Sequence, residues 1–253
     1  MGFETKYSLG ICIPVWNRGQ IFAIAFKSLI RQLEGIQSTI WIFDNGSDQE
    51  TKDIIHSISG NEDQIIHKVF LHKNMGIPYV ANIFAKAIQE NCDYAGYQSP
   101  EFIMMMDADA YFKKPIIDFL TVFKTNYGVG LVSGHDSIEH TAIKETVWSI
   151  NNREIHISEK DNERMLTMVM RKDEFLLNYP FPHYRNRDVD WEITQWNPNS
   201  LLKRNRKIVV FSDYVLHLGI NISTWNTSEQ QLENAEEIDE VRKILEEAGV
   251  SSL

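Results

Sequence analysis

Residues 102–109 read Phe-Ile-Met-Met-Met-Asp-Ala-Asp, an unbroken apolar run that ends in two carboxylates one residue apart. An apolar run without polar alternation is typical of a central strand that is covered on both faces. Where such a strand runs out into a loop, carboxylates at positions i and i+2 can face one small volume. In open α/β sheets the ligand crevice lies at the carboxyl ends of the strands. The sequence therefore predicts a binding site at Asp107 and Asp109.

These paired carboxylates suit a hard divalent cation. Mg²⁺ and Mn²⁺ prefer oxygen ligands and commonly complete their shell with substrate phosphates. A D-x-D tripeptide alone is most often a loop or cap without an ion, and its place at a strand end is what favours a site here. A phosphatase of the D-x-D-x-T/V type fits poorly because Tyr111 stands where Thr or Val is needed. An EF-hand fits poorly because residues 112–115 (FKKP) bring no further oxygen donors and no glycine.

Outward from this strand, the first half of the chain alternates strand-like and helix-like stretches. Apolar or β-branched runs bounded by turn residues indicate strands, and apolar residues at helical spacing indicate helices. Asp48 is expected to cap one of these helices. Strands are predicted at 8–15, 38–43, 65–71 and 102–106, and helices at 21–33, 49–59 and 78–90. This alternation predicts an α/β fold with a doubly wound, mainly parallel central sheet flanked by helices.

The second half has a mixed pattern. A hairpin is predicted around Asn151-Asn152, with strands at 147–150 and 153–158. Further strands are predicted at 164–171, 208–211 and 215–218. Residues 190–202 are expected to be mainly helical, although Pro198 breaks or reshapes the helix. Residues 229–247 form an acidic amphipathic pattern that predicts a helix stopped by Gly249. No linker separates the two halves.

Composition excludes some classes of partner. The 253 residues carry a formal net charge of −10, which argues against nucleic acid because phosphate backbones are bound by basic surfaces. No apolar run approaches the roughly 20 residues that a membrane-spanning helix needs. No leader-like segment opens the sequence, and Cys12 and Cys92 are expected to be reduced core thiols. We therefore expect a cytoplasmic protein whose membrane contact, where it occurs, is peripheral and at the inner face.

Four stretches, in order and at natural spacings, resemble the GT-A-fold glycosyltransferases of family 2. Residues 13–18 (IPVWNR) are similar to that family's I/T-P-x-Y/F-N-R opening, and residues 42–48 (IFDNGSD) to its V-V-D-D-G-S-x-D segment. Residues 74–76 (NMG) with Ala81-Asn82 resemble its N-x-G…A-x-N pattern. Residues 106–109 (MDAD) resemble its D-x-D. Any one of these is weak, but the ordered set is strong.

The resemblance continues into the second half. Residues 168–171 (MVMR) resemble the strand before the family's acceptor segment, and residues 187–191 (RDVDW) resemble its E-D-V-D-L/W motif. Arg187 replaces the usual Glu, but Asp188 is kept at the position that usually carries the catalytic base. Residues 215–219 (VLHLG) are similar to the V-x-H-x-G closing strand. The Q-x-x-R-W motif of processive synthases is absent.

The resemblance implies an inverting, metal-assisted glycosyltransferase that uses a nucleotide-sugar donor, expected to be UDP-linked, and a saccharide, lipid-linked or protein acceptor. It implies one GT-A domain over residues 1–253. The donor-binding half would cover about 1–110, a smaller mixed acceptor and catalytic half about 111–227, and the C-terminal helix about 228–253.

The same resemblance assigns roles to single residues. Asp188 would be the general base, and Mn²⁺ or Mg²⁺ would be held by Asp107, Asp109 and His217. Asp190 and Trp191 are expected to contact the acceptor. Donor contacts are expected from Pro14, Val15, Asn17, Arg18, Asp44, Asn74, Asn82 and Asp107.

Each of these roles has a plainer alternative. Asp44 could be only a turn residue, because the sequence Asp-Asn-Gly-Ser favours a turn, and Arg18 could be only a surface charge. His217 and Trp191 could be packing residues, and Asp188 could merely cap a helix.

Two other functions compete with this interpretation. A nucleotidylyltransferase would share the sheet architecture, but it needs a glycine-rich opening, and residues 13–20 (IPVWNRGQ) contain one glycine. A non-catalytic nucleotide-sugar-binding relative is a second alternative. Retention of Asp107, Asp109 and Asp188 together argues against it.

Overall fold

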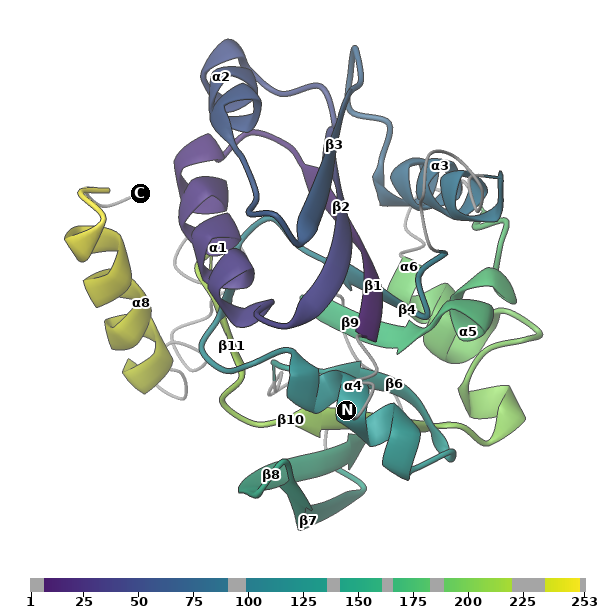
Figure 1. The fold of residues 1–253 in the computed structure, drawn as a ribbon. Helices are drawn as coiled ribbons and strands as arrows, with labels where there is room; N and C mark the ends of the chain where they lie inside the picture. Colours follow the sequence, from purple (N-terminus) through teal and green to yellow (C-terminus); the bar gives the residue numbers. More distant parts are fainter. Residues whose placement is uncertain are drawn as a thin grey trace.

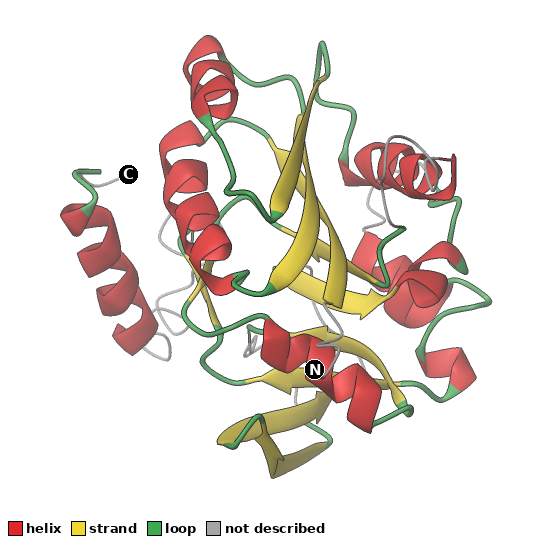
Figure 2. Cartoon of the chain, in the orientation of Figure 1, coloured by secondary structure: helices red, strands yellow, loops and turns green. Residues whose placement is uncertain are grey.

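The computed structural model describes residues 7–90, 99–135, 142–160, 166–182, 189–219 and 235–250. Within these ranges the chain forms a nine-stranded sheet with helices on both faces, and a separate two-stranded ribbon (Figure 1). Helices and strands alternate along the first half, whereas after α4 strands and short helical elements follow one another without regular alternation (Figure 2). The α/β fold class predicted from the sequence is confirmed.

The first half supplies the parallel part of the sheet, in the order β3-β2-β1-β4. The register pairs Val15 with Asp44, so β1 and β2 end at the same edge and the turns that follow them meet there. Asp48 caps α2 as predicted, because its carboxylate accepts a hydrogen bond from the Thr51 amide. The elements, all predicted to within a few residues, are β1 (Tyr7–Val15), α1 (Gly19–Gln32), β2 (Ile36–Asp44), α2 (Gln49–Ser57), β3 (Gln64–Phe70), α3 (Ile77–Glu90) and β4 (Phe102–Met106).

The second half extends the same sheet as a mixed structure, in the order β4-β9-β6-β10-β8-β7. Only β8 and β9 run against the other seven strands. The predicted hairpin is present, and its turn residues Asn151 and Asn152 both have positive φ, as a tight hairpin turn requires. The strands are β6 (Val129–Ser133), β7 (Lys144–Ile150), β8 (Arg153–Lys160), β9 (Thr167–Arg171) and β10 (Lys207–Phe211).

Several elements differ from the sequence-based expectation. The helix expected over 190–202 extends only to Trp196 and ends before Pro198, the break that the sequence predicted, because proline has no amide hydrogen to continue a helix. Its parts are α6 (Val189–Trp191) and the π-helical η1 (Glu192–Trp196), and the 3₁₀ turn η2 (Leu202–Arg204) follows. The sequence had assigned no element to β5 (Ala110–Phe112), α4 (Ile117–Thr125), β6 or α5 (Lys172–Leu176). The ribbon pairs β5 with β11 (Val215–His217), and α8 (Ala235–Glu247) is the last helix.

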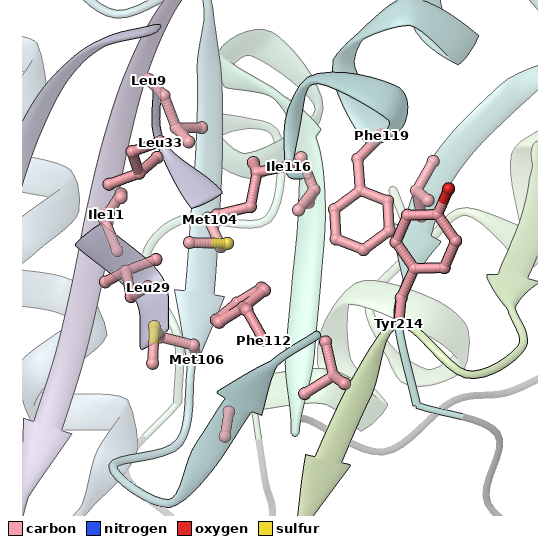
Figure 3. Close-up of a cluster of buried hydrophobic side chains, with 14 of the residues drawn as sticks. Leu9, Ile11, Leu29, Leu33, Met104, Met106, Phe112, Ile116, Phe119 and Tyr214 are labelled. Carbon is pink, nitrogen blue, oxygen red and sulfur yellow. The ribbon is translucent and has the colours of Figure 1, made fainter. Parts of the chain in front are cut away.

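The central strands bury side chains on both faces, as the unbroken apolar run of β4 predicted. Phe102, Met104 and Met106 pack in one cluster beneath α1 and α4, and Figure 3 shows part of it, including Leu29, Phe112 and Phe119. Ile103 and Met105 pack in a second cluster on the opposite face, against α3. Alternation along a strand sends neighbouring side chains to opposite faces, so two cores hold the sheet rigidly and fix the positions of its strand ends.

Two further expectations concern cysteines and membranes. Cys12 is fully buried, and burial raises the pKa of its thiol well above the ordinary value, as expected for an inert core thiol. Cys92 lies outside the described residues. Across the ranges that the structure describes, no helix has the length and apolar character needed to cross a membrane.

Candidate active site

A cavity of about 510 Å³ lies at the carboxyl ends of β1, β2 and β4. Its position follows from the parallel half of the sheet, because those strands end at one edge. It brings together residues from the start, the middle and the end of the described chain. The lining residues are Pro14, Val15, Trp16, Asn17, Arg18, Ile21, Asn45, Asn74, Gly76, Ile77, Asp107, Ala108, Asp109 and His217.

The turn after β1 directs Arg18 into this cavity. Asn17 and Arg18 both adopt left-handed backbone conformations, with φ of 55° and 59°. The Asn17 side chain accepts a hydrogen bond from the Asp48 amide at 3.0 Å, and the Asn17 amide donates to the Ser47 hydroxyl at 2.9 Å. Left-handed residues other than glycine cost on the order of 1–3 kcal/mol each and persist only where surrounding contacts enforce them. The structure therefore holds Arg18 here at an energetic cost.

Asp109 is the centre of the charged end of the cavity. It is 7% exposed, and its Oδ2 lies 3.2 Å from Arg18 Nη1 and 3.3 Å from His217 Nε2. Burial by itself would raise the pKa of Asp109, but the hydrogen bond and charge of His217, together with Arg18, hold that pKa below its usual range. The carboxylate is therefore ionised at neutral pH.

Asp107 directly follows β4, two residues before Asp109. It lines the cavity and is half-buried, and its backbone amide donates to the Leu166 carbonyl at 3.0 Å. The two carboxylates of the D-x-D therefore border one volume, as the sequence predicted.

The side chains present supply part of the ligand set that a divalent cation needs. Among the residues that the structure describes, no three His, Cys, Asp or Glu side chains are grouped closely enough to hold a metal ion by themselves. Asp109 Oδ2 and His217 Nε2 are 3.3 Å apart, a spacing that two ligands of one ion can have. Because Mg²⁺ and its relatives keep several waters or phosphate oxygens, two protein ligands can be sufficient.

The turn after β2 forms a second, buried part of the site. Asp44 is completely buried, and its Oδ1 accepts from the Ser47 amide at 2.9 Å, the turn contact that its plainer alternative predicts. Its Oδ2 has no hydrogen-bond partner within the described part of the chain. Gly46 allows this turn to pack tightly, since a Cβ there, at φ +79°, would lie 2.3 Å from the Lys73 carbonyl carbon. An orphaned carboxylate oxygen in such a place suits an incoming N–H donor.

Asn45 and Asn74 join this turn to the loop after β3. Asn45 Nδ2 donates to Asn74 Oδ1 at 3.0 Å, and Asn45 Oδ1 accepts from the Met75 amide at 2.8 Å. Both asparagines line the cavity. Asn74 was expected at the site from the sequence, whereas Asn45 was not.

Comparison with known proteins agrees with this geometry. The family model described as glycosyl transferase family 2 matches residues 10–194. The chain belongs to this family. Among curated protein sequences, none matches significantly.

Solved structures confirm the GT-A fold. TarS from S. aureus superposes with a TM-score of 0.58 at 16% identity, covering 91% of this chain and 43% of TarS, so the chain spans less than half of that protein. A fragment of S. aureus TarS, residues 1–349, in complex with UDP-GlcNAc gives 0.58 at 15% identity, covering 94% and 66%. The mannosyltransferase PcManGT from Pyrobaculum calidifontis, in complex with GDP-Man and Mn²⁺, gives 0.57 at 11%, covering 99% and 77%.

Some residues that the family resemblance assigned to the site, Asp44 among them, are not among those that line the cavity, and their roles stay predictions. The Asn82 amide donates to the Phe181 carbonyl and accepts from the Phe181 amide, both at 2.8 Å, and Asn82 is not among the residues that line the cavity. Asn82 thus fixes the backbone before residues 183–188. Asp188 and Arg187 lie outside the described residues.

The two expected acceptor residues also lie outside the cavity lining. Asp190 is buried at the start of α6, where its Oδ1 accepts from the Trp191 amide at 2.8 Å. The Trp191 ring stacks on Trp196, with centroids 5.1 Å apart and planes 24° apart. Both residues follow the segment that contains Asp188, which lies outside the described residues, so their acceptor role stays a prediction.

Sequence reasoning did not assign a role to Trp16. Its side chain lines the cavity and is 56% exposed, which is unusual for an indole. The signal was present in the family resemblance, since Trp16 occupies the aromatic position of the I/T-P-x-Y/F-N-R opening.

Proposed function

We propose that this chain is an inverting glycosyltransferase that uses a UDP-linked sugar as its donor. It transfers the sugar to a hydroxyl group of an acceptor, which is a saccharide, a lipid-linked molecule or a protein. The observation that carries the proposal is the convergence of Arg18 and His217 on Asp109 Oδ2 in the strand-end cavity. The cavity volume of about 510 Å³ lies within the range of small-molecule and cofactor sites.

One end of the cavity suits a nucleoside. The exposed Trp16 ring offers a flat face on which a base can stack, an interaction worth about 1–3 kcal/mol. The backbone of Pro14 and Val15 lines the cavity, and the buried Asp44 is the register partner of Val15. Its orphaned Oδ2 would accept from a base N–H. The related structures named above hold UDP-GlcNAc in one case and GDP-Man in another, so the choice of base is a matter for experiment.

The other end suits a diphosphate. The Arg18 guanidinium presents several N–H donors in a planar fork that matches phosphate oxygens. Asp109 and His217, with Asp107 beside them, would hold Mn²⁺ or Mg²⁺. A bound ion would neutralise the negative charge that develops on the leaving diphosphate.

The remaining requirement is a base for the acceptor. In this proposal the Asp188 carboxylate takes the proton of the acceptor hydroxyl as its oxygen attacks the anomeric carbon. The bond from that carbon to the diphosphate breaks on the opposite side, so the configuration inverts. Asp190 and Trp191, which follow Asp188 in sequence, would contact the acceptor.

A thermal-stability panel tests the proposal. The protein is heated with UDP, GDP, UDP-sugars and GDP-sugars, each with Mn²⁺ or with EDTA. A ligand at 100 times its Kd stabilises the native state by about 2.7 kcal/mol, so a UDP compound should raise the unfolding temperature clearly. The Asp109→Ala variant should lose the difference between Mn²⁺ and EDTA.

The outcomes separate the candidate functions. No shift with any nucleotide would refute the proposal, and equal shifts with and without Mn²⁺ would refute its metal component. Binding without any sugar transfer or hydrolysis would favour a non-catalytic relative. Proton NMR of the product reports the anomeric configuration, and retention would rule out the role given to Asp188.

A further inference from the structure

The last helix packs beside the charged end of the site rather than on the central sheet. In Figure 1, α8 lies next to α1 and β11 on one side of the molecule. Its buried residues Ile238, Val241 and Leu245 form an apolar cluster of their own with α1 and β11. Ile21 belongs to this cluster and also lines the cavity. The helix is thus in packing contact with elements that build the site.

Glu237, in the first turns of α8, is aimed at this end of the site. Its Oε1 accepts a hydrogen bond from the His217 backbone amide at 3.2 Å. The same oxygen lies 3.5 Å from His135 Nε2, which is within ion-pair range although long for a hydrogen bond. The Glu237 side chain is 21% exposed. The His135 and His217 rings are arranged edge to face, with centroids 6.2 Å apart.

The strand that carries His217 needs such support. β11 has three residues and, among the strands that the structure describes, pairs only with β5, which also has three. So short a ribbon is marginal without further packing. His217 in turn lies 3.3 Å from Asp109 Oδ2. A path of direct contacts therefore runs from Glu237 through His217 to Asp109.

We propose that Glu237 is a positioning residue for the diphosphate end of the site, so that docking of α8 sets the affinity for the donor. This inference rests on the proposed function. Glu237 holds the backbone of β11 at His217, and His217 keeps its imidazole against Asp109. Groups that orient a ligating side chain commonly matter nearly as much as the ligand itself.

A matched control lies on the next turn of the same helix. Glu240 pairs with Lys113 Nζ at 2.9 Å, and Lys113 also pairs with Asp213. This contact anchors α8 but does not reach His217. A Glu240 variant therefore shows how much UDP affinity is lost when α8 is docked less firmly. A Glu237 variant removes the support of His217 as well.

The experiment compares Glu237→Ala, Glu237→Gln and Glu240→Ala in the full chain. Calorimetry measures the Kd of UDP with Mn²⁺ and with EDTA, and a thermal melt measures stability without ligand. Glu237→Ala should weaken UDP binding in Mn²⁺ by about 10- to 100-fold. Glu240→Ala should weaken it by less than about threefold, because this part-buried ion pair does not touch His217 and Lys113 keeps its second partner, Asp213. Glu237→Gln keeps an acceptor oxygen for the His217 amide, so it should recover most of the affinity.

The opposite results are distinct. Glu237→Ala with wild-type UDP affinity would overturn this inference and leave the proposed function intact. If Glu237→Ala and Glu240→Ala lose the same UDP affinity and the same melting temperature, Glu237 only helps to dock α8. That result would also overturn the inference. Wild-type protein that binds no nucleotide would overturn the proposed function, and this inference with it.

Discussion

A methyl group at Gly219 would fall inside the charged cluster of the cavity. A Cβ built there lies 2.3 Å from Asp109 Oδ2, and 3.1 Å from both Arg18 Nη1 and His217 Nε2. Ordinary contact begins at 3.4 Å, so in Gly219→Ala the carboxylate must retreat by about 1 Å. A displacement of about 1 Å in a catalytic site can cost about 100-fold in rate. We therefore expect Gly219→Ala to lower turnover by about that factor and to weaken UDP binding in Mn²⁺.

Folding should tolerate the same change. The obstructing atoms are the far ends of side chains that border a cavity, and Gly219 has no positive φ that would strain an alanine. Overpacking a closed core costs about 1–3 kcal/mol, and we expect the low end, about 1 kcal/mol, measured by urea unfolding. Gly128→Ala is the control, since its Cβ would meet only Asn126 Oδ1, at 3.2 Å. Wild-type turnover and UDP affinity in Gly219→Ala would refute the geometry given for Asp109.

Three further predictions follow from single contacts. Asp44→Ala should weaken nucleotide binding by about 1–3 kcal/mol in calorimetry with little loss of stability, and unchanged affinity would leave Asp44 only a turn residue. Asp188→Asn should keep the donor Kd near wild type but lower turnover by about 10²–10⁴-fold, whereas near-normal turnover with a small loss of stability would mark a helix cap. Tyr214→Phe removes a 2.8 Å hydrogen bond to the buried Asp118 carboxylate. It should lower the free energy of unfolding in urea by about 1–3 kcal/mol and leave turnover unchanged. An unchanged free energy of unfolding would mean that Asp118 finds another donor.

The parallel half of the fold was predictable because each element carries its own local signal. β4 is an unbroken apolar run, and β1 and β2 are apolar runs that end at turn residues. The missed helix α4 lacks such a signal, since a nine-residue stretch rich in apolar residues can be read as strand or helix. The antiparallel insertion of β9 between β4 and β6 depends on packing between distant segments. Periodicity along the chain carries no information on that pairing.

The candidate site also has residues that the sequence could predict and residues that it could not. Asp107 and Asp109 were expected at the cavity because a strand end that carries two carboxylates is a recognisable pattern, whereas Asn74, which also lines the cavity, was assigned from the family resemblance. Asn82 was assigned to the donor from the family resemblance, but it hydrogen-bonds the Phe181 backbone, 99 residues away. Glu237 carried no signal, because a glutamate in an acidic amphipathic helix is indistinguishable from its solvated neighbours until the helix is docked.

The cluster around Asp109 is difficult to explain as a device for stability. Burial of the Asp109 carboxylate removes it from water at a cost, whereas its ion pair with Arg18, whose side chain is 45% exposed, returns little stabilisation. Here the partner Arg18 adds a left-handed backbone, which is a further cost. The three groups come from positions 18, 109 and 217, so the fold must be complete before they meet. An arrangement that costs folding energy at a strand-end cavity points to a ligand, and the diphosphate with a divalent cation of the proposed function would match both signs of charge present there.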